Sequence, residues 1–177
     1  MSDSLAIPEL HTDRLLLRGH RLEDFVHTAA LWADPQVTEF ILEVPATREE
    51  AWARFLRYRG HWSYLGYGYW AIFERATGAF VGEAGIGDFH RDLTPSLDGI
   101  PELGWVLATE HHGKGYATEA VRAIAAWGEA HFGRVRTACL IDPENAASIH
   151  VAEKVGFREF TRTTFHGNPA ILFERVP

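Results

Sequence analysis

The spacing of apolar side chains predicts an alternation of strands and helices from the start of the chain. Residues 14–19 (RLLLRG) form a short apolar run that is typical of a strand. Residues 21–34 follow with helical spacing, and Pro35 stands just after the end of that helix. Thr47 is followed by acidic residues, so a second helix is expected to begin there with Thr47 as its N-cap.

The rest of the chain favours strands around two further helices. A polar connection, residues 90–101, separates the strands of the middle part. The pattern predicts strands in residues 67–75, 79–89, 102–108 and 135–141, helices in residues 115–132 and 145–155, and a closing hairpin in residues 157–176 around HGNP. This order of elements predicts a mixed α/β or α+β layered fold.

Length and composition suit an ordinary globular domain. The chain has 177 residues, of which 46% are hydrophobic and 23% charged, and we expect one domain over residues 1–177. No apolar run approaches the roughly 18 residues that a membrane span needs. The first residues lack the pattern of a signal peptide, and Cys139 is the single cysteine. A cytoplasmic protein without an internal disulfide is therefore expected.

The charge of the chain restricts its partners. The formal net charge is −7, which argues against broad binding to nucleic acid, since that needs clustered Lys and Arg. No membrane partner is expected either. The charge does not exclude a local basic pocket for a small anion, and it weakly favours a cationic acceptor. A homodimer stays open.

The stretch EHHGKGYATEA, residues 110–120, carries the strongest chemical signal. His111 and His112 are adjacent, so their side chains diverge, and the sequence predicts no metal site there or elsewhere. The spacing from Gly113 to Gly115 is too short for a nucleoside-triphosphate loop, and no Ser or Thr follows the lysine.

Two glycines at the start of a helix leave its first N–H groups accessible. These groups have no intrahelical partner and carry partial positive charge, so they can bind a phosphate or pyrophosphate. Lys114 could add a point charge. A tight strand-to-helix turn without a ligand explains the glycines equally well, and the residues alone leave both interpretations open.

Together with later motifs, this stretch resembles a known family. ELGWVLATEHHGKGYATEA followed by NAASIHVAEKVGF resembles the Gcn5-related N-acetyltransferase (GNAT) superfamily, and more narrowly its ribosomal-protein N-terminal acetyltransferases. LHTDRLLLR and DPQVTEFI extend the resemblance over nearly the whole chain. The resemblance implies a strongly twisted mixed sheet that is flanked by helices and splayed open to hold acetyl-CoA as the co-substrate.

The resemblance also implies the residues that bind acetyl-CoA. A turn would hold the CoA pyrophosphate on backbone N–H groups, and the strand before it would pair with the pantetheine arm and direct an N–H group at the thioester oxygen. A helix cap would contact the pantetheine. These residues are His112, Gly113, Lys114, Gly115, Tyr116 and Ala117 in the turn, Trp105, Val106 and Leu107 in the strand, and Asn145 at the cap.

The chain departs from the family pattern at two positions. Glu110 stands where Gln or Arg is common, so a side-chain contact is lost. Ala152 stands where many relatives carry the tyrosine that protonates the leaving thiolate. The ribosomal branch has a serine three residues after the Asn, here Ser148. The resemblance thus implies that Ser148 takes part in binding acetyl-CoA through a contact to its thiol, and the acid is Ser148, a water or nothing. Ser148 could instead only help to satisfy the helix start.

Three carboxylates are candidates for the general base that deprotonates the acceptor. Glu102 is the first, because it lies on the strand that leads into the turn, although it could be an ordinary strand-edge carboxylate. Glu83, a charge inside an apolar strand, is the second, and Asp88 is a weaker third. Three tryptophans are expected to line the acceptor entrance: Trp52, Trp62 and Trp70. Cys139 is expected to be buried and inert.

The sequence thus predicts an acetyl-CoA-dependent N-acetyltransferase that works by direct transfer to a primary amine. The acceptor is either a protein N-terminus or a small amine. The alternative is a module that binds and senses acyl-CoA without turnover, and the missing tyrosine at Ala152 keeps that alternative open.

Overall fold

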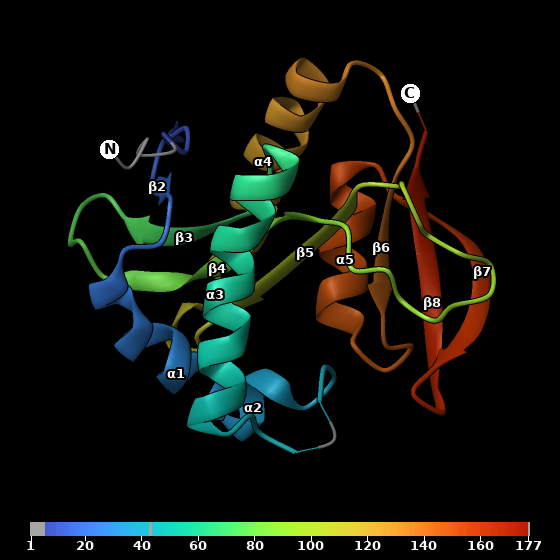
Figure 1. The fold of residues 1–177 in the computed structure, drawn as a ribbon, viewed down its shortest axis with the longest axis horizontal. Helices are drawn as coiled ribbons and strands as arrows, with labels where there is room; N and C mark the ends of the chain where they lie inside the picture. Colours follow the sequence, from blue (N-terminus) through green and yellow to red (C-terminus); the bar gives the residue numbers. More distant parts are fainter. Residues whose placement is uncertain (1–5, 43, 177) are drawn as a thin grey trace.

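Eight strands form one mixed sheet with helices on both of its faces (Figure 1). The computed structural model describes residues 6–42 and 44–176. Helices α1 and α3 pack together on one face, and α4 and α5 pack together on the other. The elements are β1 (Leu10–His11), β2 (Leu15–Arg18), η1 (Leu22–Asp24), α1 (Phe25–Ala33), α2 (Pro35–Thr38), α3 (Arg48–Leu65), β3 (Tyr69–Glu74), β4 (Phe80–Gly87), β5 (Glu102–Leu107), η2 (Thr109–His111), α4 (Tyr116–Phe132), β6 (Thr137–Ile141), α5 (Ala146–Val155), β7 (Arg158–Phe165) and β8 (Asn168–Arg175).

The sheet opens between its two central strands. The strand order is β1-β2-β3-β4-β5-β6-β8-β7, and β5 and β6 are the parallel pair. Strand β5 pairs with β4 along its whole length, whereas in the described residues its pairing with β6 is limited to Glu102 opposite Ala138. Beyond that position the two strands diverge (Figure 1). The predicted fold class, a mixed sheet splayed open between flanking helices, is confirmed.

Local sequence signals fix the ends of the helices as expected. Thr47 caps α3: its side chain accepts a hydrogen bond from the Glu50 N–H, and the Glu50 carboxylate accepts one from the Thr47 N–H. Gly66 ends α3 in the left-handed conformation that favours glycine. Asn145 caps α5 and Gly156 ends it, as the sequence predicts.

Two short elements were not expected from the sequence. Strand β1 precedes β2 and pairs with it. Pro35 does more than follow the first helix, because it begins α2, where its missing N–H needs no partner. The Asp34 side chain caps this helix by accepting from the Gln36 N–H. The closing turn is also shorter than HGNP, since Asn168 already belongs to β8.

The tryptophans expected at the acceptor entrance lie elsewhere, so that prediction is wrong. Trp62 and Trp70 are 3% and 0% exposed, and their rings pack edge to face at 4.8 Å in the core. Both rings also contact Trp127 of α4. Trp52 packs outside the core against Phe25. Burying such large apolar surfaces stabilises the packing of α3 and α4 on the sheet, which explains their positions.

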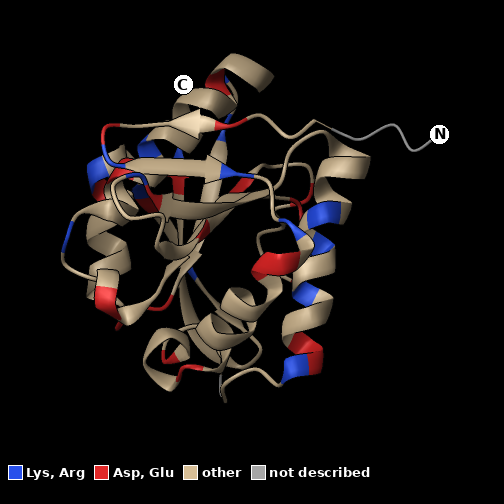
Figure 2. Cartoon of the chain, turned by 90° about the vertical axis from the view of Figure 1, so that its left-hand side faces the viewer, with Lys and Arg blue, Asp and Glu red and all other residues tan. Residues whose placement is uncertain are grey.

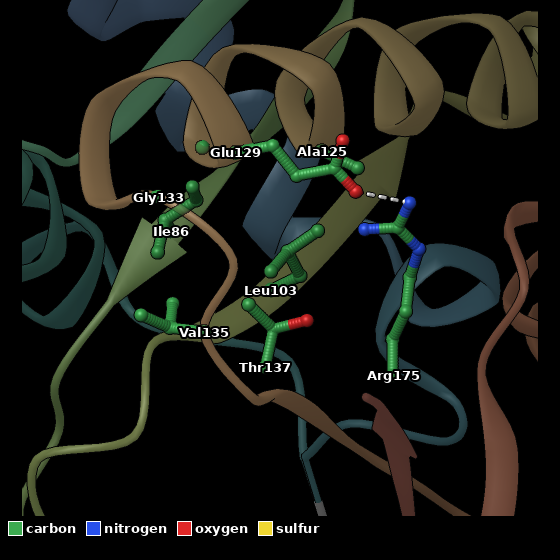
Figure 3. A pocket seen from close by; sticks show the side chains of 9 residues that line it. Ile86, Leu103, Ala125, Glu129, Gly133, Val135, Thr137 and Arg175 are labelled. Carbon is green, nitrogen blue, oxygen red and sulfur yellow. Dashed lines mark ion pairs between the residues drawn. The ribbon is translucent and has the colours of Figure 1, made fainter. Parts of the chain in front are cut away.

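A small cavity lies between α4 and the sheet (Figure 3). Its volume is about 10 Å³, which is room for about one water molecule and no larger ligand. Ile86 and Leu103 line it from the sheet, and an ion pair between Glu129 and Arg175 lies beside it. This cavity is therefore not a site for a substrate.

Among the described helices, none has both the length and the hydropathy needed to cross a bilayer.

Candidate functional site

A large cleft opens where β5 and β6 diverge. Its volume is about 1250 Å³, above the roughly 300–1,000 Å³ of most small-molecule sites. Residues 103–106 of β5 and 139–141 of β6 form its two inner walls. The start of α5, helix α3, the segment after α2 and the β7–β8 hairpin complete the lining. The cleft is large enough for an extended ligand and a second reactant.

The predicted phosphate turn lies just beyond the end of β5, at the start of α4. Gly113 and Gly115 have φ angles of 72° and 79°, a conformation that favours glycine. A Cβ atom at Gly113 would meet nothing within 4 Å, and one at Gly115 would meet only Arg14 Nη2 at 3.5 Å. Within the described chain, the N–H groups of residues 113–118 have no hydrogen-bond acceptor. The turn therefore offers open space and free donors at a helix N-terminus.

The side chains around the turn hold it in place. Arg14 Nη1 donates to the Lys114 carbonyl oxygen at 2.9 Å, and Arg14 Nε donates to the Glu119 carboxylate at 2.7 Å. The Arg14 guanidinium also covers the ring of Tyr116, whose hydroxyl bonds to Glu74. These contacts preorganise the donors before any ligand arrives.

His112 connects the turn to the strand before it. Its Nε2 atom lies 2.8 Å from the carbonyl oxygen of Leu107, the last residue of β5. Trp105 and Val106 line the cleft, whereas Leu107 and the turn continue beyond the cleft lining. The residues predicted for the pyrophosphate and for the pantetheine arm therefore form one continuous path, and Ala117 lies in the first turn of α4.

Asn145 and Ser148 meet at the other wall of the cleft. The Asn145 side-chain oxygen accepts from the Ser148 N–H at 3.0 Å, so Asn145 provides the cap. Ser148 lines the cleft, and its hydroxyl has no hydrogen-bond partner among the described residues. Its side chain is therefore not what satisfies the helix start.

Ala152 points away from the cleft. It is 0% exposed and packs in the main core, where a tyrosine would not fit without moving its neighbours. The alanine at this position is thus explained by packing.

Glu102 lies on the floor of the cleft in an ion pair. It is 5% exposed, and Arg91 donates to both of its carboxylate oxygens at 2.8–3.1 Å. Burial lowers the pKa of Arg91, but the hydrogen bonds and the charge of Glu102 outweigh this and raise it. Oε1 accepts from both Nε and Nη2 of Arg91, whereas Oε2 accepts only from Nε and still has a lone pair for a further donor.

Glu83 lies behind the cleft wall and does not line the cleft. It is 0% exposed and accepts hydrogen bonds from Thr28 Oγ1 at 2.5 Å and Trp32 Nε1 at 3.0 Å, with His20 Nε2 at 3.2 Å. Burial raises the pKa of Glu83, but these partners outweigh it, so the pKa lies below its usual value. Because Glu83 does not line the cleft and accepts from Trp32, it is placed to hold the Trp32 ring in the cleft wall.

Tyr69 is a cleft residue that the sequence analysis missed. Its ring packs over Gly85, and its hydroxyl fills the space that a side chain at Gly104 would need, since a Cβ there would lie 2.1 Å from it. Burial and then the charge of Glu102 raise the pKa of Tyr69, so the phenol is neutral. A glycine in the middle of a strand often marks the close approach of another group. Gly85 and Gly104 in the sequence could therefore have indicated a large side chain packed against these strands.

Asp88 lies outside the cleft lining, and the Cys139 thiol is buried. Asp88 does not line the cleft, and with His90 and Asp98 it forms a group on the connection after β4 whose ligand atoms lie within 4.8 Å of one another. Both His90 and Asp98 are exposed, and His90 Nδ1 lies 3.6 Å from Asp98 Oδ1. Cys139 is 1% exposed, and burial raises the pKa of its thiol, so it is not a reactive thiolate.

Comparison with known proteins agrees with this geometry. The family model of the Acetyltransferase (GNAT) domain matches residues 14–158. Protein YkkB of Bacillus subtilis is 32% identical over 173 residues, which cover 94% of this chain and 95% of YkkB. A solved GnaT-family acetyltransferase of Bordetella pertussis has a TM-score of 0.84 at 30% identity, and the match covers 96% of this chain and 100% of that one.

The resemblance to the ribosomal-protein branch is confirmed at the level of the fold. RimL, a ribosomal L7/L12 α-N-protein acetyltransferase solved with coenzyme A, has a TM-score of 0.77 at 15% identity, over 96% of this chain and 98% of RimL. The sequence motifs, the open sheet and the family model, which matches residues 14–158, all indicate the same family. The chain belongs to the GNAT family and is an acetyltransferase.

Proposed function

We propose that the protein transfers the acetyl group of acetyl-CoA directly to the primary amine of a protein N-terminus or a small molecule. The observation that carries this proposal is a continuous path. It begins at the free N–H groups of residues 113–118, follows the unpaired edge of β5 and ends in the cleft of about 1250 Å³. RimL, which shares the fold, was solved with coenzyme A, and this supports the proposal.

The chain's own residues fit acetyl-CoA along this path. The N–H groups from Gly113 to Ala117 would hold the pyrophosphate, because they are unpaired and lie at the positive end of α4. Trp105, Val106 and Leu107 would hold the pantetheine arm by adding it to the edge of β5 that β6 leaves free. Asn145 would contact it from the opposite wall. Acetyl-CoA supplies an acetyl group that is already activated as a thioester.

The acceptor must lose a proton before its nitrogen can attack. Glu102 is the buried carboxylate of the cleft lining, and the remaining lone pair of its Oε2 atom can accept a proton from an ammonium group directly or through a water. The Ser148 hydroxyl and the neutral Tyr69 phenol are two uncommitted donors within the same cleft. Such donors stabilise negative charge as it develops.

An assay with purified protein tests the function. With acetyl-CoA and a panel of amines and short peptides, we expect release of free thiol that depends on the amine, together with the acetylated product in the mass spectrum. Saturable binding of CoA without turnover of any amine or peptide would favour the alternative, a module that binds acyl-CoA without catalysis.

Ser148→Ala separates a chemical role of the hydroxyl from a structural one. The hydroxyl bonds to no described group, so its loss should leave the melting temperature unchanged. If it donates to the reacting groups, the saturating rate should fall about tenfold, which corresponds to one hydrogen bond of ~1.4 kcal/mol.

Asn145→Ala is the matched variant for stability. It removes the cap of α5 and should lower the stability by about 1 kcal/mol, or about 2–4 °C in melting temperature. A Ser148→Ala protein that melts early but turns over normally would refute the chemical role.

A further inference from the structure

Two arginines of α3 line the cleft without a direct ion pair, although the carboxylate of Glu50 lies close enough that, after the hydrogen bonds from Thr47, the charge of Arg54 lowers its pKa. Arg54 and Arg57 line the wall formed by α3, and no described carboxylate lies within ion-pair distance of either guanidinium. Figure 2 shows basic residues along this helix, at the right of the view, with acidic residues gathered in its first turn. This is unexpected in a chain with a formal net charge of −7.

Glu50, the residue expected to pair with Arg54, makes its hydrogen bonds to Thr47 instead. Glu50 stands one helical turn before Arg54, at the spacing that normally forms an ion pair. Its carboxylate instead accepts from the Thr47 N–H at 2.7 Å and from the Thr47 hydroxyl at 2.9 Å. The capping box that starts α3 therefore leaves Arg54 unpaired.

Both guanidinium groups are held by aromatic rings. Arg54 Cζ lies 3.7 Å from the centre of the Trp32 ring, and its Nε is buried with no acceptor among the described residues. Trp32 is itself fixed by its hydrogen bond to Glu83. Arg57 Cζ lies 5.3 Å from the ring of Phe89. The donors are thus placed in advance, which reduces the entropy lost when they bind a ligand.

The surroundings of the pair favour an anion. Burial lowers the pKa of Arg57, and the charge of Arg54 lowers it further. Arg91 also contacts the Phe89 ring, but its charge is matched by Glu102. Arg54 is half-buried and Arg57 is exposed at the cleft. Their like charges repel each other, and a bound anion offsets this repulsion while it accepts from their free donors.

We propose that Arg54 and Arg57 bind a carboxylate of the acceptor, so that the preferred acceptor is an amine that also bears a carboxylate, such as an amino acid. This inference rests on the proposed acetyl transfer. The pair lines the cleft from α3, whereas the phosphate turn lies beyond the end of β5 and outside the cleft lining. The carboxylate would be held on the wall of α3 while the amine lies toward Glu102 on the floor.

Matched acceptors test this without any variant. Amino acids are compared with their carboxamides, and O-phosphoethanolamine is compared with ethanolamine to separate a carboxylate from a phosphate. We expect kcat/KM for the amino acids to exceed that for their carboxamides at least tenfold. Equal values for the two members of each pair would overturn the proposal, and a preference confined to the phosphate pair would overturn its carboxylate form.

The double variant Arg54→Met and Arg57→Met removes the charges and keeps unbranched side chains that pack against the rings. It should lower kcat/KM at least tenfold for the amino acids and change it less than about twofold for the carboxamides. Arg59→Met is the control, because Arg59 is exposed on the same helix and does not line the cleft. Equal losses for both members of a pair would contradict the proposal.

Binding measurements keep the inference separate from the proposed function. With CoA present and no acetyl group to transfer, calorimetry should show that an amino acid binds more tightly than its carboxamide, and that the double variant loses this difference. If no amine is acetylated but this difference is found, the proposed function fails and the anion subsite stands. If the double variant loses affinity for CoA itself, the arginines serve CoA and the proposal is overturned.

Discussion

Gly115→Val should weaken the binding of CoA and acetyl-CoA at least tenfold, which is ~1.4 kcal/mol. The glycine has a φ angle of 79° and lies among the free N–H groups at the start of α4. A valine side chain would enter the space where a phosphate must approach, since only Arg14 Nη2 borders that space at 3.5 Å. Isothermal titration calorimetry with both ligands measures the effect.

Gly66→Val is the matched control for backbone strain. Gly66 has nearly the same backbone angles, φ 75° and ψ 8° against φ 79° and ψ 5°, and nothing lies within 4 Å of its Cβ position. Both variants should lose about 1–2 kcal/mol of stability to the left-handed conformation. Only Gly115→Val should also lose affinity for CoA. If the two variants bind CoA with equal affinity, the pyrophosphate binds elsewhere.

The features that local sequence determines were predictable. Thr47, Asn145 and the glycines of residues 113–115 act within a few residues of their own position, through caps and left-handed backbone. The open sheet followed from the resemblance over most of the chain, and the divergence of β5 from β6 agrees with it.

The partners of the charged groups were not predictable, because the fold brings them from distant segments. Glu83 looked like a reactive charge in an apolar strand, yet Thr28 and Trp32 of α1 satisfy it. Arg91, from the polar connection, reaches Glu102 on β5. Helical spacing alone also could not show that Glu50 leaves Arg54 unpaired, since Thr47 competes for the same carboxylate.

Glu102→Gln should lower the saturating turnover about a hundredfold or more if Glu102 is the general base. The amide keeps the shape of the side chain but cannot accept the proton of an ammonium group. Affinity for CoA should stay close to that of the wild type, because Glu102 lies at the opposite end of β5 from the phosphate turn. The pH–rate profile of the variant should also lose its ascending limb.

The ion pair complicates this test, and a second variant resolves it. Removing the charge of Glu102 leaves Arg91, whose side chain is 25% exposed, without its partner, so this variant is also expected to lose stability. Arg91→Gln breaks the same pair but keeps the carboxylate, so it should retain a larger rate than Glu102→Gln. Turnover and melting temperature are measured on both variants, well below either melting point. Equal losses of rate would mean that the ion pair acts through structure alone, and full activity of Glu102→Gln would assign the proton to a water or to the free-base fraction of the acceptor.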